Sequence, residues 1–233
     1  INSLMGIELL TSLTVLSCHH NYLTSLSGIE NITSLTSLNC CNNQLTSVKG
    51  IESLTSLINL FCNGNKLTTL NGISSLTSLE HLNCHRNQLT TLKEVNSLTS
   101  LKKLYCTQNL LTTLEGINGL SQLSDFNCSY NQLTTLGDIR SLTSLTHLNC
   151  SFNYLTHLDG LQCLSNLMTL GISGNLLSNR EQIKNFVNKD RASLLTVKKV
   201  DFLKIPNELF RTNIIMQDMI SNRRSNILLL RDY

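Results

Sequence analysis

The sequence contains no long hydrophobic run and little net charge. No apolar stretch approaches the ~20 residues of a membrane-spanning helix. The first residues lack the basic region followed by an apolar region that marks a secretory signal. The net charge of +3 is too small to imply a nucleic-acid or membrane surface by itself. We therefore expect neither a secretory signal nor contact with a membrane.

Signals for catalysis and metal binding are also scarce. The sequence has no glycine-rich phosphate loop and no glycine-flanked nucleophile. Cys41 and His19 form the only candidate catalytic dyad, and no turn suited to an oxyanion hole accompanies them. With His20 they offer thiolate and imidazole ligands for zinc, but their spacing matches no known zinc motif and a fourth ligand is not evident. We expect no enzyme activity, no cofactor and no metal site.

A repeated pattern is what the sequence does contain. It follows LxxLxCxxNxLTxLxGIxSLTS and restarts every 22 residues without insertion or deletion, at Leu13, Leu35, Leu57, Leu79, Leu101, Leu123, Leu145 and Leu167. Residues 1–12 match the second half of the pattern. Self-similarity at a fixed period indicates a solenoid. We number the positions of each repeat from its first leucine and predict a solenoid over residues 1–178.

The first half of each repeat suits a short strand. In residues 35–40, Leu38 and Cys40 alternate with Ser37 and Asn39, so the first pair is predicted to face inward and the second outward. Stacked copies would form a parallel sheet, while the leucines of the second half fill the far side. A turn with positive φ is predicted at the glycines that recur in the second half of the repeat, namely Gly28, Gly50, Gly72, Gly116 and Gly160. Repeats four and six have Glu94 and Asp138 at this place instead.

Two polar or reactive residue types recur in register. An asparagine occupies position nine of each repeat, where a buried amide must be hydrogen-bonded, so we predict a structural ladder. Seven of the nine cysteines occupy position six and are predicted to be small buried hydrophobes: Cys18, Cys40, Cys62, Cys84, Cys106, Cys128 and Cys150. Periodic thiols without pairwise partners favour an intracellular, reducing compartment over a disulfide framework.

The pattern resembles the leucine-rich repeat, with cysteine in the third leucine position of LxxLxLxxNxL. The 22-residue period and the LTxLxGIxSLTS half are similar to the SDS22-like and internalin-like classes. The resemblance implies an α/β solenoid: a right-handed horseshoe with a parallel sheet on its concave face and irregular or 3-10 turns on the convex side. It also implies protein recognition. The thiol content, independently of the resemblance, favours a cytoplasmic location.

The two ends depart from the repeat. The chain opens in mid-repeat without a capping element, so we expect either further residues upstream or self-association through the uncapped N-terminal rung. Residues 179–233 are predicted to form a C-terminal cap, with helices near 180–188 and 207–222 and a degenerate strand near 197–202.

The outward positions of repeats three to seven concentrate large side chains. Aromatic residues and arginine often anchor protein interfaces, so we predict that a protein or peptide binds the concave face through Phe61, His81, His85, Arg86, Lys103, Tyr105, Tyr130, His147 and Phe152. Alternatives are a regulatory subunit, as SDS22-like proteins are for a phosphatase, or the substrate-recognition part of a larger effector. A zinc- or nucleic-acid-binding scaffold belongs to another class; Glu80 and Asp125 weaken the nucleic-acid version by interrupting the basic residues.

Overall fold

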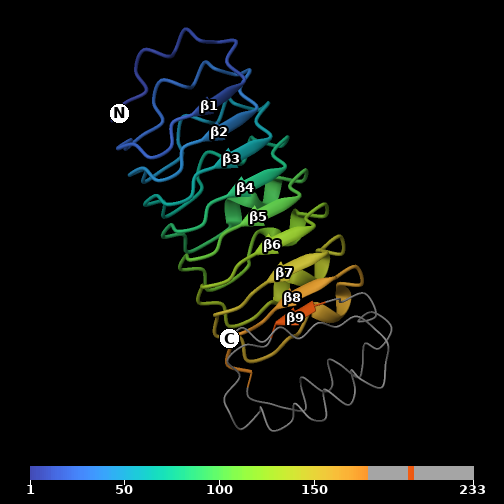
Figure 1. The fold of residues 1–233 in the computed structure, drawn as a ribbon. Helices are drawn as coiled ribbons and strands as arrows, with labels where there is room; N and C mark the ends of the chain where they lie inside the picture. Colours follow the sequence, from blue (N-terminus) through green and yellow to red (C-terminus); the bar gives the residue numbers. More distant parts are fainter. Residues whose placement is uncertain (178–198, 202–233) are drawn as a thin grey trace.

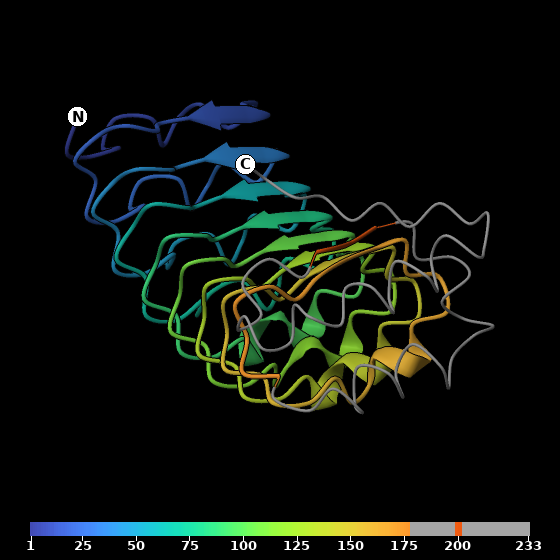
Figure 2. The same cartoon turned by 60° about the horizontal axis from the view of Figure 1, so that its bottom comes forward.

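The computed structural model describes residues 1–177 and 199–201 as a solenoid (Figures 1 and 2). Each repeat contributes one three-residue strand at positions three to five, so the eight repeats give eight parallel strands. They are β1 (Val15–Ser17), β2 (Ser37–Asn39), β3 (Asn59–Phe61), β4 (His81–Asn83), β5 (Lys103–Tyr105), β6 (Asp125–Asn127), β7 (His147–Asn149) and β8 (Thr169–Gly171). A further strand, β9 (Lys199–Asp201), pairs in parallel with β8.

The sheet keeps the sequence order from β1 to β9, and its register follows the repeat. Leu16 is opposite Leu38, and Leu38 is opposite Leu60, so equivalent residues stack in straight columns. A strand of only three residues cannot bury enough surface alone. Its central side chain packs instead between its counterparts on the rungs above and below, which is how a repeat protein builds a continuous core.

The core consists of leucine, isoleucine, valine and cysteine side chains at the predicted inward positions, nearly all without exposed surface. Leu38 and Cys40 are fully buried, as the alternation predicted, whereas Ser37 and Asn39 are half-buried on the outer side of the sheet. Phe126 replaces leucine at position four of β6 and is the largest fully buried side chain among the described residues.

The convex side consists of turns and short 3-10 helices. The glycines predicted to have positive φ do so, with values of 99° to 107°. Where Glu94 and Asp138 replace glycine, the chain forms five-residue 3-10 helices, η1 (Lys93–Ser97) and η3 (Gly137–Ser141). Three-residue 3-10 helices follow Gly116 and Gly160, namely η2 (Ile117–Gly119) and η4 (Leu161–Cys163).

The asparagine ladder at position nine is confirmed. The Asn43 amide donates to the carbonyl oxygens of Cys18 and Cys40, and its Oδ1 accepts the backbone N–H of Leu23. Each rung is thereby tied to the next where the strand ends. The helices predicted near 180–188 and 207–222 lie outside the described residues. Within the described part of the chain, no helix is long and apolar enough to cross a membrane.

Candidate functional site

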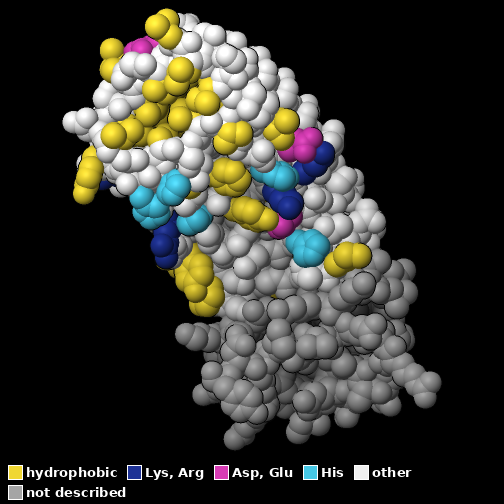
Figure 3. Space-filling view, turned by 45° about the horizontal axis from the view of Figure 1, so that its top comes forward, with side chains coloured by type: hydrophobic (Ala, Val, Ile, Leu, Met, Phe, Trp, Pro, Cys, Tyr) yellow, Lys and Arg dark blue, Asp and Glu magenta, His cyan; other side chains and the backbone are white. Residues whose placement is uncertain are grey.

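The outer surface of the sheet, here called the strand face, presents the side chains of positions three and five. Figure 3 shows hydrophobic, basic, acidic and histidine side chains on this face. Five of the nine predicted interface residues lie on its strands and point outward from the buried central leucines: Phe61 on β3, His81 on β4, Lys103 and Tyr105 on β5, and His147 on β7.

The other four predicted residues lie beyond the strands, in the turn that follows each one. His85 occupies position seven, and Arg86, Tyr130 and Phe152 occupy position eight. We expected both positions to be exposed on the concave face. Position eight is mostly exposed, as at Arg86 and Tyr130, whereas position seven differs. Position seven is buried in several repeats, as at Cys41, Ser129 and Ser151, because the chain turns inward there.

Position eight has a left-handed backbone in every full repeat. Its φ values lie between 52° and 65° at His20, Asn42, Gly64, Arg86, Gln108, Tyr130, Phe152 and Gly174. Six of these eight residues carry a side chain in a conformation that disfavours one. The tight turn into the asparagine ladder imposes this conformation, and it directs the position-eight side chains along one rim of the strand face.

The rim contains a stacked aromatic pair. The rings of Tyr130 and Phe152 are nearly parallel at 14°, with centroids 4.3 Å apart. Tyr130 remains 49% exposed. Gly174 occupies the equivalent position in the next repeat, where a Cβ atom would lie 2.5 Å from the Phe152 ring. The absence of a side chain at Gly174 therefore leaves room for the pair.

A polar contact joins β5 and β6 on the strand face. The Tyr105 hydroxyl donates to Oδ2 of Asp125 at 2.6 Å. Partial burial and this carboxylate raise the pKa of Tyr105 from 10.0 to about 12, so the phenol is a stable donor at neutral pH. Tyr105 was predicted as an interface residue. Asp125 was not, although its outward position on the next strand was visible in the repeat.

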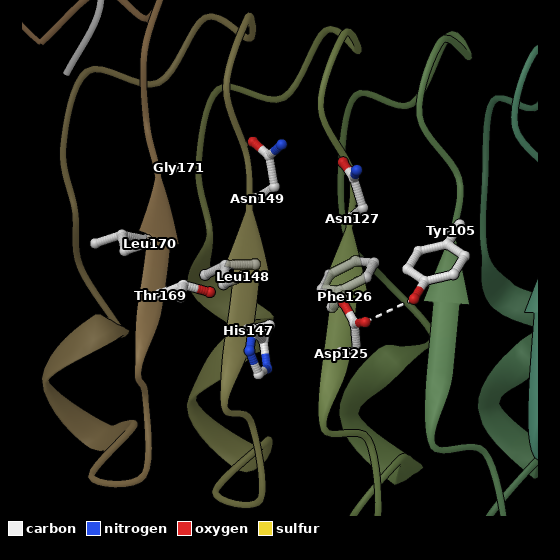
Figure 4. Close-up of a pocket in the computed structure, with 10 residues that line it drawn as sticks. All are labelled: Tyr105, Asp125, Phe126, Asn127, His147, Leu148, Asn149, Thr169, Leu170 and Gly171. Carbon is white, nitrogen blue, oxygen red and sulfur yellow. Dashed lines mark hydrogen bonds between the residues drawn. The ribbon is translucent and has the colours of Figure 1, made fainter. Parts of the chain in front are cut away.

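A hollow of about 250 Å³ opens on the strand face between β5 and β8 (Figure 4). The outward side chains of four strands line it, over a floor of central strand residues: Tyr105, Asp125, Phe126, Asn127, His147, Leu148, Asn149, Thr169, Leu170 and Gly171. Of the predicted interface residues, only Tyr105 and His147 belong to it. Gly171 is the signal that sequence reasoning passed over, since it is the only glycine at position five of β1–β8.

Three charged residues beside the strand face have partners. Lys102 forms an ion pair with Glu80 at 2.8 Å, and the hydrogen bond from Lys102 lowers the pKa of that carboxyl. Arg86 donates through Nε to Gln108 at 2.7 Å. Burial, followed by the nearby Arg86 charge, lowers the pKa of His85, so its imidazole is more readily neutral at physiological pH.

His19, His20 and Cys41 do not form a zinc site. Nδ1 of His19 contacts the Ser17 hydroxyl at 2.7 Å, and the Cys41 thiol is directed to Oδ1 of Asn63 at 2.6 Å. Cys41 is 8% exposed, and burial raises its pKa, so it is not the open thiol that the dyad and the zinc site required. Among residues 1–177, no group of three or more histidine, cysteine or acidic side chains is arranged to hold a metal ion.

The position-six thiols form a buried ladder along the strands. Cys40 donates to the carbonyl oxygen of Phe61 at 3.4 Å and Cys150 to that of Gly171 at 3.3 Å, so the thiols follow the sheet instead of pairing with each other. All nine cysteines are free, and Cys163 alone is exposed. Burial raises the pKa of Cys84 and of Cys150 to about 12, which makes these thiols poor nucleophiles.

Comparison with known proteins agrees with this architecture. The family model for leucine-rich repeats (two copies) matches residues 11–53, 33–77, 55–97 and 77–119. A search of curated proteins gave no match. Among solved structures, an internalin (inlF) from Listeria monocytogenes has a TM-score of 0.81 and 27% identity, covering 88% of this chain and 58% of that one.

Two further structures are similar. A leucine-rich-repeat protein of Leptospira interrogans gives a TM-score of 0.75 at 31% identity, over 84% of this chain and 50% of its own. The functional domain of InlJ from Listeria monocytogenes, described as including a cysteine ladder, gives 0.66 at 32% identity over 87% and 46%. The chain thus spans only 58% and 50% of the first two proteins. Repeat, fold and thiol ladder agree: the chain is a leucine-rich-repeat protein with an internalin-like solenoid.

Proposed function

We propose that the chain is a non-enzymatic recognition module that binds a protein or peptide on its strand face. Leucine-rich-repeat domains of this kind are typical of protein–protein interaction modules and are usually non-catalytic. The observation that carries the proposal is the Tyr130–Phe152 stack, a large aromatic surface held rigidly at the rim of the face. Tyrosine is among the residues most enriched at the hot spots of protein interfaces.

Charge and hydrogen bonding favour a protein over a nucleic acid as the partner. Nucleic-acid binding usually needs a continuous basic stripe. Beside this face Lys102 is paired with Glu80, and on the face Asp125 lies between Lys103 and His147 in the register of the sheet. The mixture of aromatic, neutral polar and paired charged groups is suited to a protein surface.

The recognition function is compatible with two wider roles. As alternatives within this proposal, the module would serve as a regulatory subunit or as the substrate-recognition part of a larger protein. Its location in a reducing, intracellular compartment stays a prediction. At the first rung, Ile1 and Leu10 are 65% and 52% exposed, although the equivalent Leu23 and Ile32 of the next repeat are fully buried. This open apolar surface supports self-association through that rung, which stays a prediction.

The test compares two pairs of tyrosine and phenylalanine substitutions. The Tyr130→Ala, Phe152→Ala variant removes the stack. The Tyr22→Ala, Tyr154→Ala variant removes two aromatic residues that are 70% and 52% exposed at position ten, off the strand face. Affinity capture with mass spectrometry identifies the partner, and titration with the purified partner then gives Kd.

The expected result is at least about a tenfold rise in Kd for the first variant, since hot-spot truncations cost about 2 kcal/mol or more. The position-ten variant should bind like the wild type. Circular dichroism must show that both variants keep the native fold. Equal affinity for all three proteins, or an equal loss in both variants, would contradict the proposal.

A further inference from the structure

The hollow between β5 and β8 exists because one repeat lacks a side chain. In the other seven repeats, position five carries serine, asparagine, phenylalanine or tyrosine, whereas β8 has Gly171. A Cβ atom there would lie 2.6 Å from Oδ1 of Asn149 and 3.0 Å from the Ser151 hydroxyl. The space is therefore a specific feature of this rung, set among polar side chains.

The upper wall of the hollow offers hydrogen-bond donors. Oδ1 of Asn127 accepts the backbone N–H of Ser129 at 3.1 Å, and Oδ1 of Asn149 accepts that of Ser151 at 3.0 Å. These bonds fix both amides, shown side by side in Figure 4. Neither Nδ2 group has an acceptor within the described residues, so two donors are available to a ligand.

The lower wall offers an acceptor. Oδ2 of Asp125 is occupied by the Tyr105 hydroxyl, and Oδ1 has no hydrogen-bond donor among the described residues. Asp125 and Asn127 are two residues apart on the same strand and on the same face, which places their backbones roughly 6.6 Å apart. The acceptor and the two donors therefore lie on the same face of the sheet, within the reach of one small polar group.

The surrounding charges disfavour an ionic ligand. A cation would be attracted to Asp125 but would face the two asparagine donors and, in register on either side, Lys103 and His147. An anion would be repelled by the Asp125 carboxylate. A neutral group that both donates and accepts a hydrogen bond can pair with Asp125 and with the asparagine amides. Tyr105, His147 and Thr169 also line the hollow, whose volume suits a side chain.

We propose that this hollow is a subsite for a glutamine or asparagine side chain presented by the bound partner. The carboxamide N–H₂ donates to Oδ1 of Asp125, and the carboxamide oxygen accepts from Nδ2 of Asn127 or Asn149. This rests on the proposed protein-recognition function and names a feature of its partner. No covalent step is involved.

The test uses short peptides instead of the natural partner. The full chain, labelled with ¹⁵N, is titrated with acetyl-Ala-Ala-X-Ala-Ala-amide, where X is Gln, Lys, Glu or Ala, and the side-chain N–H₂ signals of Asn127 and Asn149 are followed by NMR. The Gln peptide should give saturable shifts of both signals. The Ala peptide should bind about tenfold more weakly, since it loses about two hydrogen bonds of roughly 0.7 kcal/mol each. The Lys and Glu peptides should also bind more weakly than the Gln peptide, since each satisfies only one wall and brings a charge that the other wall disfavours.

The hollow can be filled with a residue that other repeats already carry at the same position. Gly171→Asn restores the side chain that position five carries in β2, β4, β6 and β7, and it should abolish the Gln-peptide shifts while the fold is kept. Ser17→Asn introduces the same residue in the same column on β1 and should leave binding intact. Thermal unfolding verifies that both variants are folded.

Three outcomes would overturn the subsite. Absence of any Gln-peptide shift means that the hollow takes no carboxamide. Equal or tighter binding of the Lys peptide makes it a cation site, and equal binding of the Ala peptide assigns the contact to the main chain. The peptide assay does not use the natural partner. Its failure would therefore overturn the subsite alone, and the proposed recognition function would still be tested by the Tyr130→Ala, Phe152→Ala variant.

Discussion

The ring of Tyr130 lies flat against the ring of Phe152, and both residues have left-handed backbones, with φ values of 53° and 56°. Stacked aromatic pairs contribute about 0.5–1.5 kcal/mol beyond their burial, which offsets part of the cost of the unfavourable backbone. The two strained turns thus hold one composite aromatic surface. Its rigidity suits it to be an anchor, because little side-chain freedom remains to be lost on binding.

The left-handed backbone at position eight predicts a stabilising substitution. Gln108 has φ of 54° and makes one exposed hydrogen bond, accepting from Arg86. Asparagine tolerates the left-handed region better than glutamine does. Gln108→Asn should therefore raise the free energy of unfolding by about 0.5–1 kcal/mol, measured by urea denaturation at pH 7.

The matched control is Gln88, which occupies position ten of the preceding repeat, whereas Gln108 occupies position eight of its own. Gln88 is exposed and is not among the residues with positive φ. Gln88→Asn should change the free energy of unfolding by no more than about 0.5 kcal/mol. Equal stabilisation in the two variants would show that backbone strain at Gln108 is not the cause.

Replacing a glycine in a convex turn is predicted to destabilise the fold, in contrast to the Gln108 substitution. Gly116 has φ of 107°, and a Cβ atom there would overlap the Leu92 carbonyl oxygen and lie 2.7 Å from the Lys93 Cα. Backbone atoms of the neighbouring rung cannot move aside cheaply. Gly116→Ala should therefore lower the free energy of unfolding by about 2–4 kcal/mol, measured by the same denaturation.

Gly137 supplies the control for that substitution. It begins η3, lacks a positive φ, and a Cβ atom would meet only the Thr135 hydroxyl at 3.6 Å. Gly137→Ala should be neutral or stabilising by about 0.4–1 kcal/mol, since alanine restricts the unfolded chain. If the two alanine variants lost stability equally, the positive φ and the close approach at Gly116 would not explain the result.

The repeat period made most of the solenoid predictable. Leu38, Cys40 and the position-nine asparagines recur at fixed spacing, so their burial and hydrogen bonding followed from the pattern. The left-handed backbone of the rim did not follow, because His85 and Tyr130 were assigned to the same outward face as the strand residues, although each strand ends at position five. The hollow requires contacts between rungs, such as Tyr105 with Asp125, which no single repeat encodes.

The ladder asparagines predict a large, position-specific loss. Asn87 donates to the carbonyl oxygens of Cys62 and Cys84, and its Oδ1 accepts the Leu67 N–H at 3.0 Å. Asn87→Ala leaves these buried groups without partners and should cost about 2–4 kcal/mol of unfolding free energy. Asn83→Ala, in the same repeat but on the half-buried strand face, should cost less than about 1 kcal/mol; similar losses would argue against a structural role for the ladder.

The thiol ladder predicts alkaline destabilisation. Burial raises the pKa of Cys84 and of Cys150 from 9.0 to about 12. The folded chain therefore retains these protons at pH values where the unfolded chain releases them. Their stabilising contribution is complete below pH 9 and is lost as the pH rises toward 12. Each thiol reduces the free energy of unfolding by about 1.4 kcal/mol per pH unit within that window.

Urea denaturation at pH 8 and pH 10 measures this effect. The two thiols together should lower the free energy of unfolding by about 3 kcal/mol between these values, in addition to the change from other groups. A Cys84→Ala, Cys150→Ala variant will be less stable at pH 8 because of its cavities, yet its further loss by pH 10 should be smaller by that amount. The variant still contains Tyr105 and the lysines, so their titration cancels in the comparison. An identical pH dependence in both proteins would mean that these buried thiols do not control alkaline stability.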